Sequence, residues 1–180
     1  MKFSLSLLSL LFLVAWGQPA SANANHYPSA LAPQPPPTVA PCINLKQMHA
    51  DGSEAVKSTC EPSRAGQNMV FDFFATWCHY CVSDLPKFRA LADEFKGKAE
   101  FRLIGEDEKE QVLRDFFKKN DFTNFAVAFD GKGDAMDGFH VRGTPTIIVI
   151  GPDKKIKLFH LGTIETPEEL AAIRAAIVSQ

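Results

Sequence analysis

The chain has 180 residues, of which 46% are hydrophobic and 22% charged, as in an ordinary globular protein. This composition excludes a wholly disordered, collagen-like or coiled-coil chain. Nineteen Lys and Arg against 21 Asp and Glu give a formal net charge of −2, so no basic surface for nucleic acid is expected.

The first 24 residues have the pattern of a secretory signal peptide. Lys2 precedes an almost uninterrupted apolar run from Leu5 to Trp16, and Ala22 and Ala24 offer small-residue cleavage sites. The run is shorter than the roughly 20 residues that a membrane-spanning helix needs. We therefore expect residues 1–24 to be removed, and the mature protein to be periplasmic or otherwise exported.

Residues 25–41 are rich in proline and poor in charge. Such a segment favours an extended, polyproline-type backbone and does not build a core. We interpret it as a linker and expect a single folded domain over residues 42–180.

From Cys42 onward, short apolar runs alternate with amphipathic segments, which predicts an α/β domain. Two extended segments, 43–48 and 55–59, flank a turn signal at Asp51-Gly52 and predict an N-terminal β-hairpin. The other strands are expected over residues 69–74, 101–104, 125–129, 146–150 and 155–161.

Apolar residues at three- and four-residue spacing predict a helix from Val82 to Phe95, ending before Gly97. A second helix is expected over residues 108–119, followed later by a Gly- and Asp-rich loop over 130–138. The inward face of the second helix is predicted to consist of Val112, Leu113, Phe116 and Phe117.

A complete start signal marks the last helix. Thr166 is expected as its N-cap, Pro167 as its first residue, and Glu169 completes a capping box. Its buried stripe is predicted to be Leu170, Ile173 and Ile177. Together, these elements predict a three-layer fold in which helices flank a central mixed β-sheet.

Two cysteines with two residues between them, Cys78 and Cys81, follow the strand predicted at 69–74 and begin the next helix. The partial positive charge of a helix N-terminus favours the thiolate form of a cysteine placed there. Such a pair can cycle between dithiol and disulfide through a mixed disulfide. We expect Cys78 to attack the substrate and Cys81 to resolve the intermediate.

A zinc site and a purely structural disulfide are the alternatives for this pair. Structural zinc needs four ligands, and Cys42 and Cys60 do not have the spacing of a second ligand pair. A disulfide that closes so short a loop would stabilise the fold little. We assign no metal site and expect no cofactor.

The sequence around the pair resembles the thioredoxin superfamily, and the resemblance covers about residues 68–179. Trp77 precedes the first cysteine, Pro86 lies five residues after the second, and Val141–Thr146 is similar to the family's cis-proline loop.

The resemblance implies that Pro145 is a cis-proline that lies against the cysteine pair, with Thr144 facing the substrate peptide. Trp77 precedes the pair, and His79 and Tyr80 lie between its two cysteines. These three residues are expected to contact the substrate as well. His79 could also stabilise the Cys78 thiolate.

Within the superfamily, the chain resembles the exported TlpA/ResA-like reductases. These proteins have a β-hairpin before the first core strand and a central strand-and-helix insert, to which residues 42–59 and 106–137 are similar. The resemblance implies a thiol:disulfide oxidoreductase that reduces disulfides of envelope proteins, including those formed by the thiols of apocytochrome c. Its implied partners are protein thiols and disulfides and a membrane electron donor, and we expect a monomer.

Asp72 lies six residues before Cys78, inside an otherwise apolar strand. Burial there should raise the pKa of its carboxyl group. It coincides with the buried Asp of cytoplasmic-type thioredoxins, which implies a proton acceptor for Cys81; a local cap or ion pair is the alternative. The exported branch usually has Asn here, Glu in place of Asp84, and Pro near Tyr80.

Three other classes fit the sequence less well. A thioredoxin-like copper chaperone would use two thiolates and a distal His such as His140. The cysteines of that family are separated by three residues, whereas Cys78 and Cys81 are separated by two. A thioredoxin-fold peroxidase would have Thr three residues before its cysteine, whereas Thr76 lies two before Cys78. The intact cysteine pair and Pro145 argue against a redox-inactive binding module.

Cys42 and Cys60 lie outside this core, with 17 residues between them. The turn at Asp51-Gly52 would bring them together, so a structural disulfide is expected, as in many exported domains. A second redox pair that passes electrons to Cys78 and Cys81 is the alternative.

Overall fold

The computed structural model describes residues 34–49, 52–62, 64–107, 109–120 and 126–179, which fall within one unit, Gln34–Gln180. The expected signal peptide and the first part of the expected linker lie outside these residues. So do Asp51 of the predicted turn and Phe125 of the predicted strand.

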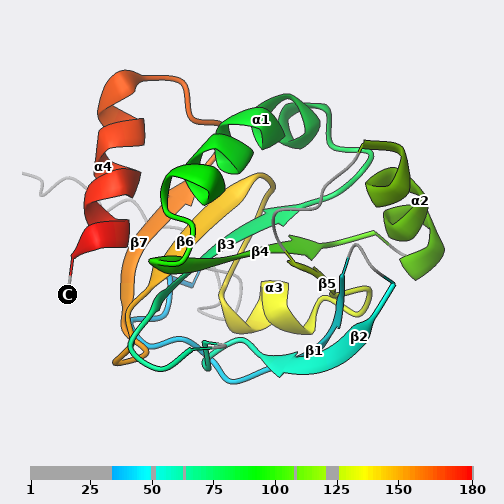
Figure 1. The fold of residues 1–180 in the computed structure, drawn as a ribbon, viewed down its shortest axis with the longest axis horizontal. Coiled ribbons are helices and arrows are strands. Elements are labelled where there is room, and N and C mark those ends of the chain that lie inside the picture. The colour runs from blue at the N-terminus through cyan, green and yellow to red at the C-terminus, as the bar shows by residue number, and fades with distance from the viewer. Residues whose placement is uncertain (1–33, 50–51, 63, 108, 121–125, 180) are drawn as a thin grey trace, which may run out of the picture. The chain divides into compact units, whose positions relative to one another are not determined.

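One mixed sheet forms the centre of this unit (Figure 1). In spatial order, its strands among the described residues are β2-β1-β5-β4-β3-β6-β7. Strands β3, β4 and β5 are parallel, and all other neighbours are antiparallel. The strand bounds are β1 Asn44–Met48, β2 Glu54–Ser58, β3 Asn68–Phe74, β4 Ala99–Gly105, β5 Ala126–Phe129, β6 Thr146–Ile150 and β7 Ile156–Leu161. The predicted mixed sheet with an N-terminal hairpin is confirmed.

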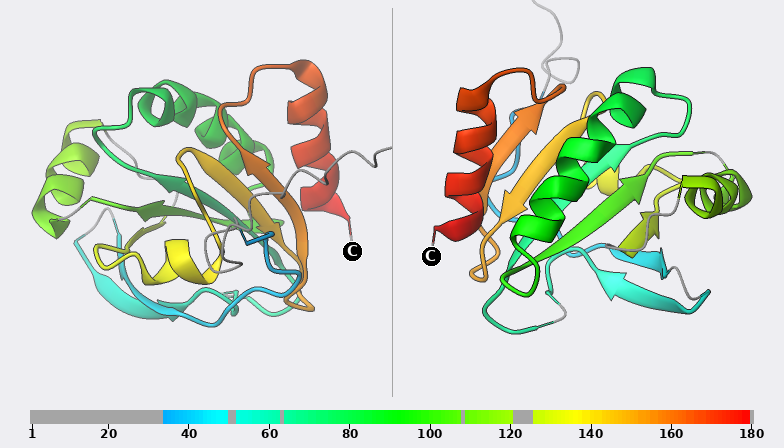
Figure 2. Two further views of the ribbon diagram at one scale, coloured as in Figure 1. Left: turned by 180° about the vertical axis from the view of Figure 1, so that it is seen from behind. Right: turned by 45° about the horizontal axis from the view of Figure 1, so that its top comes forward.

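Helices cover both faces of the sheet (Figures 1 and 2). Their bounds are α1 His79–Glu94, α2 Glu110–Asn120, α3 Asp134–Gly138 and α4 Pro167–Val178. Helices α1 and α4 pack on one face and α3 packs on the other, which confirms the predicted three-layer thioredoxin-like fold.

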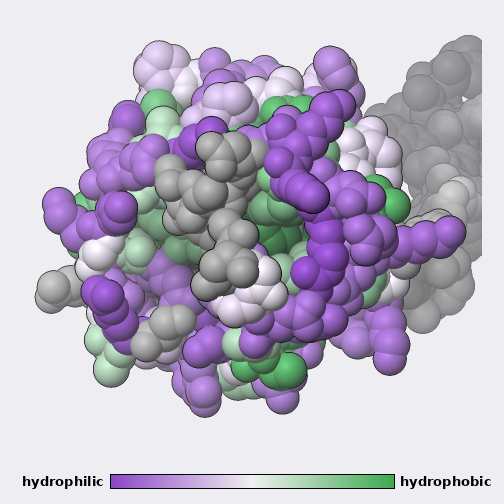
Figure 3. Space-filling model, turned by 45° about the vertical axis from the view of Figure 1, so that its right-hand side comes forward, coloured by the Kyte–Doolittle hydropathy of each residue, from purple (hydrophilic) through white to green (hydrophobic). Residues whose placement is uncertain are grey.

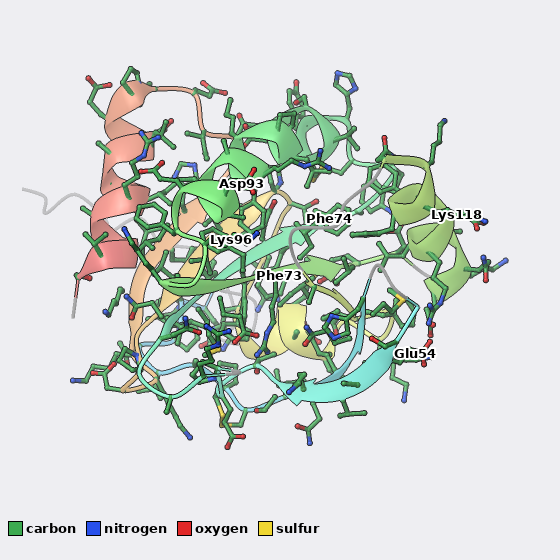
Figure 4. All side chains as sticks on the ribbon, viewed as in Figure 1. Glu54, Phe73, Phe74, Asp93, Lys96 and Lys118 are labelled. Carbon is green, nitrogen blue, oxygen red and sulfur yellow. A yellow bond between two sulfur atoms is a disulfide. The ribbon has the colours of Figure 1, made fainter. Side chains whose placement is uncertain are left out.

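Strand β3 divides the hydrophobic core into two halves, because successive side chains point to opposite faces of the sheet. Val70 and Phe74 belong to the half beneath α1, whereas Phe71 and Phe73 belong to the half on the α3 side. Every residue of β3 is buried, and Figure 4 labels Phe73 and Phe74 on this central strand. The sequence of β3 therefore does not alternate between polar and apolar residues, as expected for a strand covered on both faces.

The segment predicted as a loop over residues 130–138 contains the short helix α3, so that prediction is wrong in part. The carboxylate of Asp130 accepts hydrogen bonds from the backbone N–H groups of Ala135 and Met136. These bonds satisfy amide groups that a helix start leaves free. The composition of the segment hid this helix, because Gly and Asp are equally typical of turns.

The inward face of α2 is narrower than predicted. Leu113 is fully buried, and Phe116 and Phe117 are half-buried with their rings near Phe74, but Val112 is 45% exposed. The side of the molecule that comes forward in Figure 3 is mainly hydrophilic, with small hydrophobic areas. A helix at the rim of the core covers only a narrow stripe, so Val112 is left outside it.

Oppositely charged side chains join α2 to the N-terminal hairpin. Lys46 pairs with Glu54 and with Glu110, at 3.0 Å in each case, and Arg114 also contacts both carboxylates. Figure 4 shows Glu54 at the end of the hairpin that lies nearest α2. These ion pairs attach the helix that follows β4 to the added strands β1 and β2.

Part of the segment expected as a linker contacts the folded unit. The N–H of Ala40 donates to the carbonyl of Lys154, and the N–H of Ile156 donates to the carbonyl of Thr38. Ala40 is buried in the core half that includes α3. Proline is tolerated at sheet edges, so a Pro-rich composition did not prevent this pairing.

The start of α4 is as predicted. Thr166 is its N-cap, Pro167 begins the helix, and the side chain and backbone of Thr166 and Glu169 bond reciprocally in a capping box. Ile173 and Ile177 are buried, whereas Leu170 is partly buried against the same core. This punctuation is local in sequence, so it could be predicted without tertiary information.

Candidate redox site at the start of helix α1

The predicted cysteine pair lies where β3 leads into α1. Cys78 is the N-cap of α1, and Cys81 lies in its first turn. The two form a disulfide with their Cα atoms 5.2 Å apart, and the backbone N–H of Cys81 donates to the Cys78 sulfur at 3.2 Å. The Cys78 sulfur therefore lies at the positive end of the helix dipole, where a thiolate is favoured.

The two cysteines differ in access to solvent. Cys81 is 0% exposed and Cys78 is 8% exposed, so a partner can approach only Cys78. Next to it, Trp77 and Tyr80 are 73% and 68% exposed, and His79 is exposed as well. The aromatic side chains expected to contact a substrate are thus exposed at the positions on either side of Cys78 in the sequence.

The loop before β6 faces the same sulfur. The peptide bond between Thr144 and Pro145 is cis, as the sequence resemblance implied. The carbonyl oxygen of Thr144 lies 3.6 Å from the Cys78 sulfur. The N–H of Gly162 donates to the carbonyl of Pro145, and the hydroxyl of Thr146 donates to that of Gly143, which hold the loop in place.

Asp72 lies in the middle of β3, beneath α1. Its neighbours across the sheet are Leu103 on β4 and Ile147 on β6, and it lies on the same face as Val70 and Phe74. The side chain is 2% exposed, and its Oδ1 atom has no hydrogen-bond partner among the residues that the structure describes. Burial, and then the negative charge of Asp84, raise the pKa of Asp72 well above its usual value.

Asp84 and Lys87 form an ion pair near Asp72, to which sequence reasoning had assigned no role. The Lys87 Nζ lies 2.8 Å from one Asp84 oxygen, and the N–H of Ile164 donates to the other at 3.0 Å. The spacing of three residues on one helix face is the sequence signal that could have identified the pair.

A second unassigned carboxylate, Asp107, fixes the loop that carries Cys78. It is 1% exposed and accepts hydrogen bonds from the Thr76 N–H at 3.1 Å and the Thr76 hydroxyl at 2.5 Å. Beside it, burial and the charges of Asp130 and Asp107 raise the pKa of Glu106 to about 9. No sequence pattern points to these contacts, because Thr76 and Asp107 are 31 residues apart.

Cys42 and Cys60 form a second disulfide, with their Cα atoms 4.8 Å apart. Cys60 is buried in the core half on the α3 side, whereas Cys78 and Cys81 belong to the half beneath α1. The central sheet therefore separates the two pairs. Arg102, which is buried, donates to the carbonyls of Ser58 and Glu61 on either side of Cys60.

The structure gives no support to a metal site within the described ranges. Groups of three or more His, Cys, Asp or Glu suited to hold a metal ion do not occur there. His140, which a copper-binding role would use, has its Nδ1 atom 2.6 Å from the carbonyl oxygen of Pro35.

A mixed sheet with a Cys-x-x-Cys pair at a helix start, facing a cis-proline, defines a thioredoxin-like protein. Residues 38–159 match the AhpC/TSA family, and the chain belongs to this family.

The chain is also similar in sequence to proteins named thiol-disulfide oxidoreductases. The chain is 28% identical over 109 residues to sporulation thiol-disulfide oxidoreductase A of Bacillus subtilis, covering 58% of this chain and 65% of that protein. It is 32% identical over 120 residues to thiol-disulfide oxidoreductase ResA of Oceanobacillus iheyensis, covering 66% of this chain and 60% of that protein. The matched region thus spans somewhat less than two thirds of these relatives.

Solved structures share the fold. A thiol:disulfide interchange protein DsbE from Chlorobium tepidum, described as putative, superposes with a TM-score of 0.65 at 23% identity, covering 80% of this chain and 97% of that one. StoA from Bacillus subtilis superposes with a TM-score of 0.59 at 22% identity, covering 76% of this chain and 99% of that one.

The helices that the structure describes include none with the length and apolar character of a membrane span.

Proposed function

We propose that the protein is a thiol:disulfide oxidoreductase that works through the Cys78–Cys81 couple. The observation that carries the proposal is the asymmetry of this pair. Cys78 is accessible at the helix start and lies 3.6 Å from the Thr144 carbonyl, whereas Cys81 is fully buried behind it. A nucleophile needs access, but a resolving cysteine needs only to reach the nucleophile.

In the reducing direction, the Cys78 thiolate attacks a disulfide of the substrate. A bond forms between the Cys78 sulfur and one substrate sulfur, and the other substrate sulfur leaves as a thiolate. Cys81 then gives up its proton and attacks the Cys78 sulfur, which releases the second substrate thiolate. Two electrons pass to the substrate, and the enzyme is left with the disulfide seen in the structure.

Asp72 is the proposed acceptor for the proton of Cys81. Both groups belong to the buried layer between β3 and α1, and the Asp72 Oδ1 atom has no other described partner. Burial raises the pKa of Asp72, which brings it closer to that of a thiol and favours proton exchange between them. The exposed Trp77, His79 and Tyr80, with the backbone at Thr144, form the proposed surface for a substrate polypeptide.

The N-terminal sequence supports the proposed compartment, and the resemblance to exported reductases supports the proposed substrate and electron donor. We infer a signal peptide over residues 1–24, export to the periplasm or an equivalent compartment, and action as a monomer on disulfides of envelope proteins. Apocytochrome c is one proposed substrate, and a membrane protein is the proposed electron donor. The persistence of two disulfides in one small domain is compatible with an oxidising compartment.

Single Cys→Ser variants test the proposed order of events. Cys78→Ser should abolish reduction of insulin disulfides, because it removes the nucleophile. Cys81→Ser should instead accumulate mixed disulfides with the substrate, visible by mass spectrometry and released by dithiothreitol. Full turnover by Cys81→Ser without any trapped species would overturn the assignment, and inactivity of the reduced wild-type protein would favour a binding module.

A further inference from the structure

An ion pair borders the buried layer that contains Asp72. The Asp84 side chain is 5% exposed, whereas that of Lys87 is 48% exposed, so the pair reaches from the core to solvent. One Asp84 oxygen contacts the Lys87 Nζ, and the other accepts the N–H of Ile164. The Lys87 Nζ also donates to the Ile164 carbonyl. These contacts fix the Asp84 carboxylate between α1 and the connection from β7 to α4.

Asp84 and Asp72 face the same buried layer, because α1 packs on the face of β3 that carries Val70, Asp72 and Phe74. Asp84 follows Cys81 by one helical turn on the buried side of α1, and its negative charge is one of the two causes that raise the pKa of Asp72. Among the described residues, the other titratable side chains on this face include the two cysteines of α1, His160 of β7, whose Nε2 atom contacts the Thr163 carbonyl, and Lys157 of β7, whose Nζ atom contacts the Asn68 Oδ1 at 3.0 Å. Strands β4 and β6 present only apolar side chains next to Asp72.

We propose that Lys87 is a positioning residue of the redox site. By pairing with Asp84, it offsets part of the negative charge that faces Asp72 and thereby sets the pH at which Cys81 attacks the mixed disulfide. This proposal rests on the proposed role of Asp72 as proton acceptor.

The direction of the effect follows from electrostatics. Lys87 takes no part in the bond changes, in which the proton of Cys81 passes to Asp72 and the Cys81 sulfur displaces the substrate thiolate from Cys78. Without the ammonium group, the negative charge of Asp84 is offset less, so Asp72 holds its proton more tightly. A smaller fraction of Asp72 is then ionised at a given pH, and the attack moves to higher pH.

The direct test is to titrate Asp72 in the oxidised full chain and to monitor the titration by ¹³C NMR of the Asp72 carboxyl carbon. Lys87→Met should move the midpoint upward by about 0.5 pH unit, less than a charge in direct contact would produce. Lys87→Arg should restore the wild-type midpoint, and the matched control Lys118→Met, on α2, should not move it. Lys87→Gln replaces Lys87→Met if the latter does not fold.

Two further measurements show whether Lys87 acts through Asp84 and whether the effect reaches the reaction. In an Asp84→Asn background, Asp72 should titrate at lower pH, and adding Lys87→Met should shift it less. The pH profile of single-turnover release from the mixed disulfide should shift with the midpoint. An unmoved Asp72 midpoint in folded Lys87→Met would overturn this proposal, even if Asp72→Asn blocks release. Normal release by Asp72→Asn would instead overturn the proposed proton acceptor.

Discussion

Asp72 shows how a single residue can oppose the fold that contains it. A carboxyl group that is 2% exposed and has no hydrogen-bond partner at Oδ1 within the described part of the chain destabilises the folded state when it ionises. Apolar residues occupy the neighbouring register positions on both sides, so nothing in the packing requires an acid here. This absence of a structural need supports the proposed role of Asp72 in proton transfer.

This conflict predicts how stability depends on pH. Because the folded-state pKa of Asp72 is raised, the unfolded chain releases this proton first as pH increases, and the contribution of Asp72 to wild-type stability falls from about pH 4 up to the folded-state pKa. Relative to wild type, Asp72→Asn should gain about 1.4 kcal/mol per pH unit over that window. Urea unfolding of the oxidised proteins at several pH values measures this difference. The exposed Asp115→Asn is the control, and a pH-independent difference for Asp72→Asn would contradict the prediction.

At the scale of elements, the loop between β3 and α1 is held by the end of a neighbouring strand. The N–H of Glu106 donates to the Phe74 carbonyl at 2.9 Å. The carboxylate of the next residue, Asp107, accepts hydrogen bonds from the backbone N–H and the hydroxyl of Thr76. The cysteine at the start of α1 is thus fixed by two contacts from the C-terminal end of β4. Such fixing keeps the nucleophile in place before a substrate binds.

Asp107→Ala should reduce stability by about 1–3 kcal/mol, because it leaves the half-buried N–H and hydroxyl of Thr76 without their acceptor. Asp107→Asn keeps one acceptor oxygen and should lose less. Chemical unfolding gives both values, and Thr76→Val in each background shows whether the losses share one contact, since coupled residues are not additive. Equal losses for the Ala and Asn variants would argue against the hydrogen bonds as the cause.

At the scale of the whole folded unit, the sheet separates two disulfides with different surroundings. Cys60 is buried beside Phe71 and Phe139 on the α3 side, away from the pair at the start of α1. Relay between the two pairs would need close approach, which the intervening sheet opposes. We therefore propose that Cys42–Cys60 is structural and closes the open end of the added hairpin, since Cys42 precedes β1 and Cys60 follows β2.

Replacing both Cys42 and Cys60 with Ala should lower the free energy of unfolding by about 3 kcal/mol and leave insulin reduction near the wild-type rate. Thermal and urea unfolding measure the first effect. Thiol counting under mild reductant is the complementary test, in which two thiols, at Cys78 and Cys81, should appear before the others. Loss of turnover in a folded double variant, or four thiols titrating together, would favour a relay.

The sequence by itself determined the features that depend on short-range chemistry. Strand β3, the start of α1 at the cysteine pair and the capping box of α4 each follow from residues within a few positions of one another. The cis bond at Pro145 followed from a resemblance between motifs and not from local physics. Only the tertiary structure brought Asp107 to Thr76 and Ile164 to Asp84, because those contacts join segments whose separation along the chain carries no periodic signal. The tertiary structure also decided that the two disulfides lie on opposite faces of the sheet. Packing of the whole fold determines which face of the sheet a cysteine far along the chain contacts.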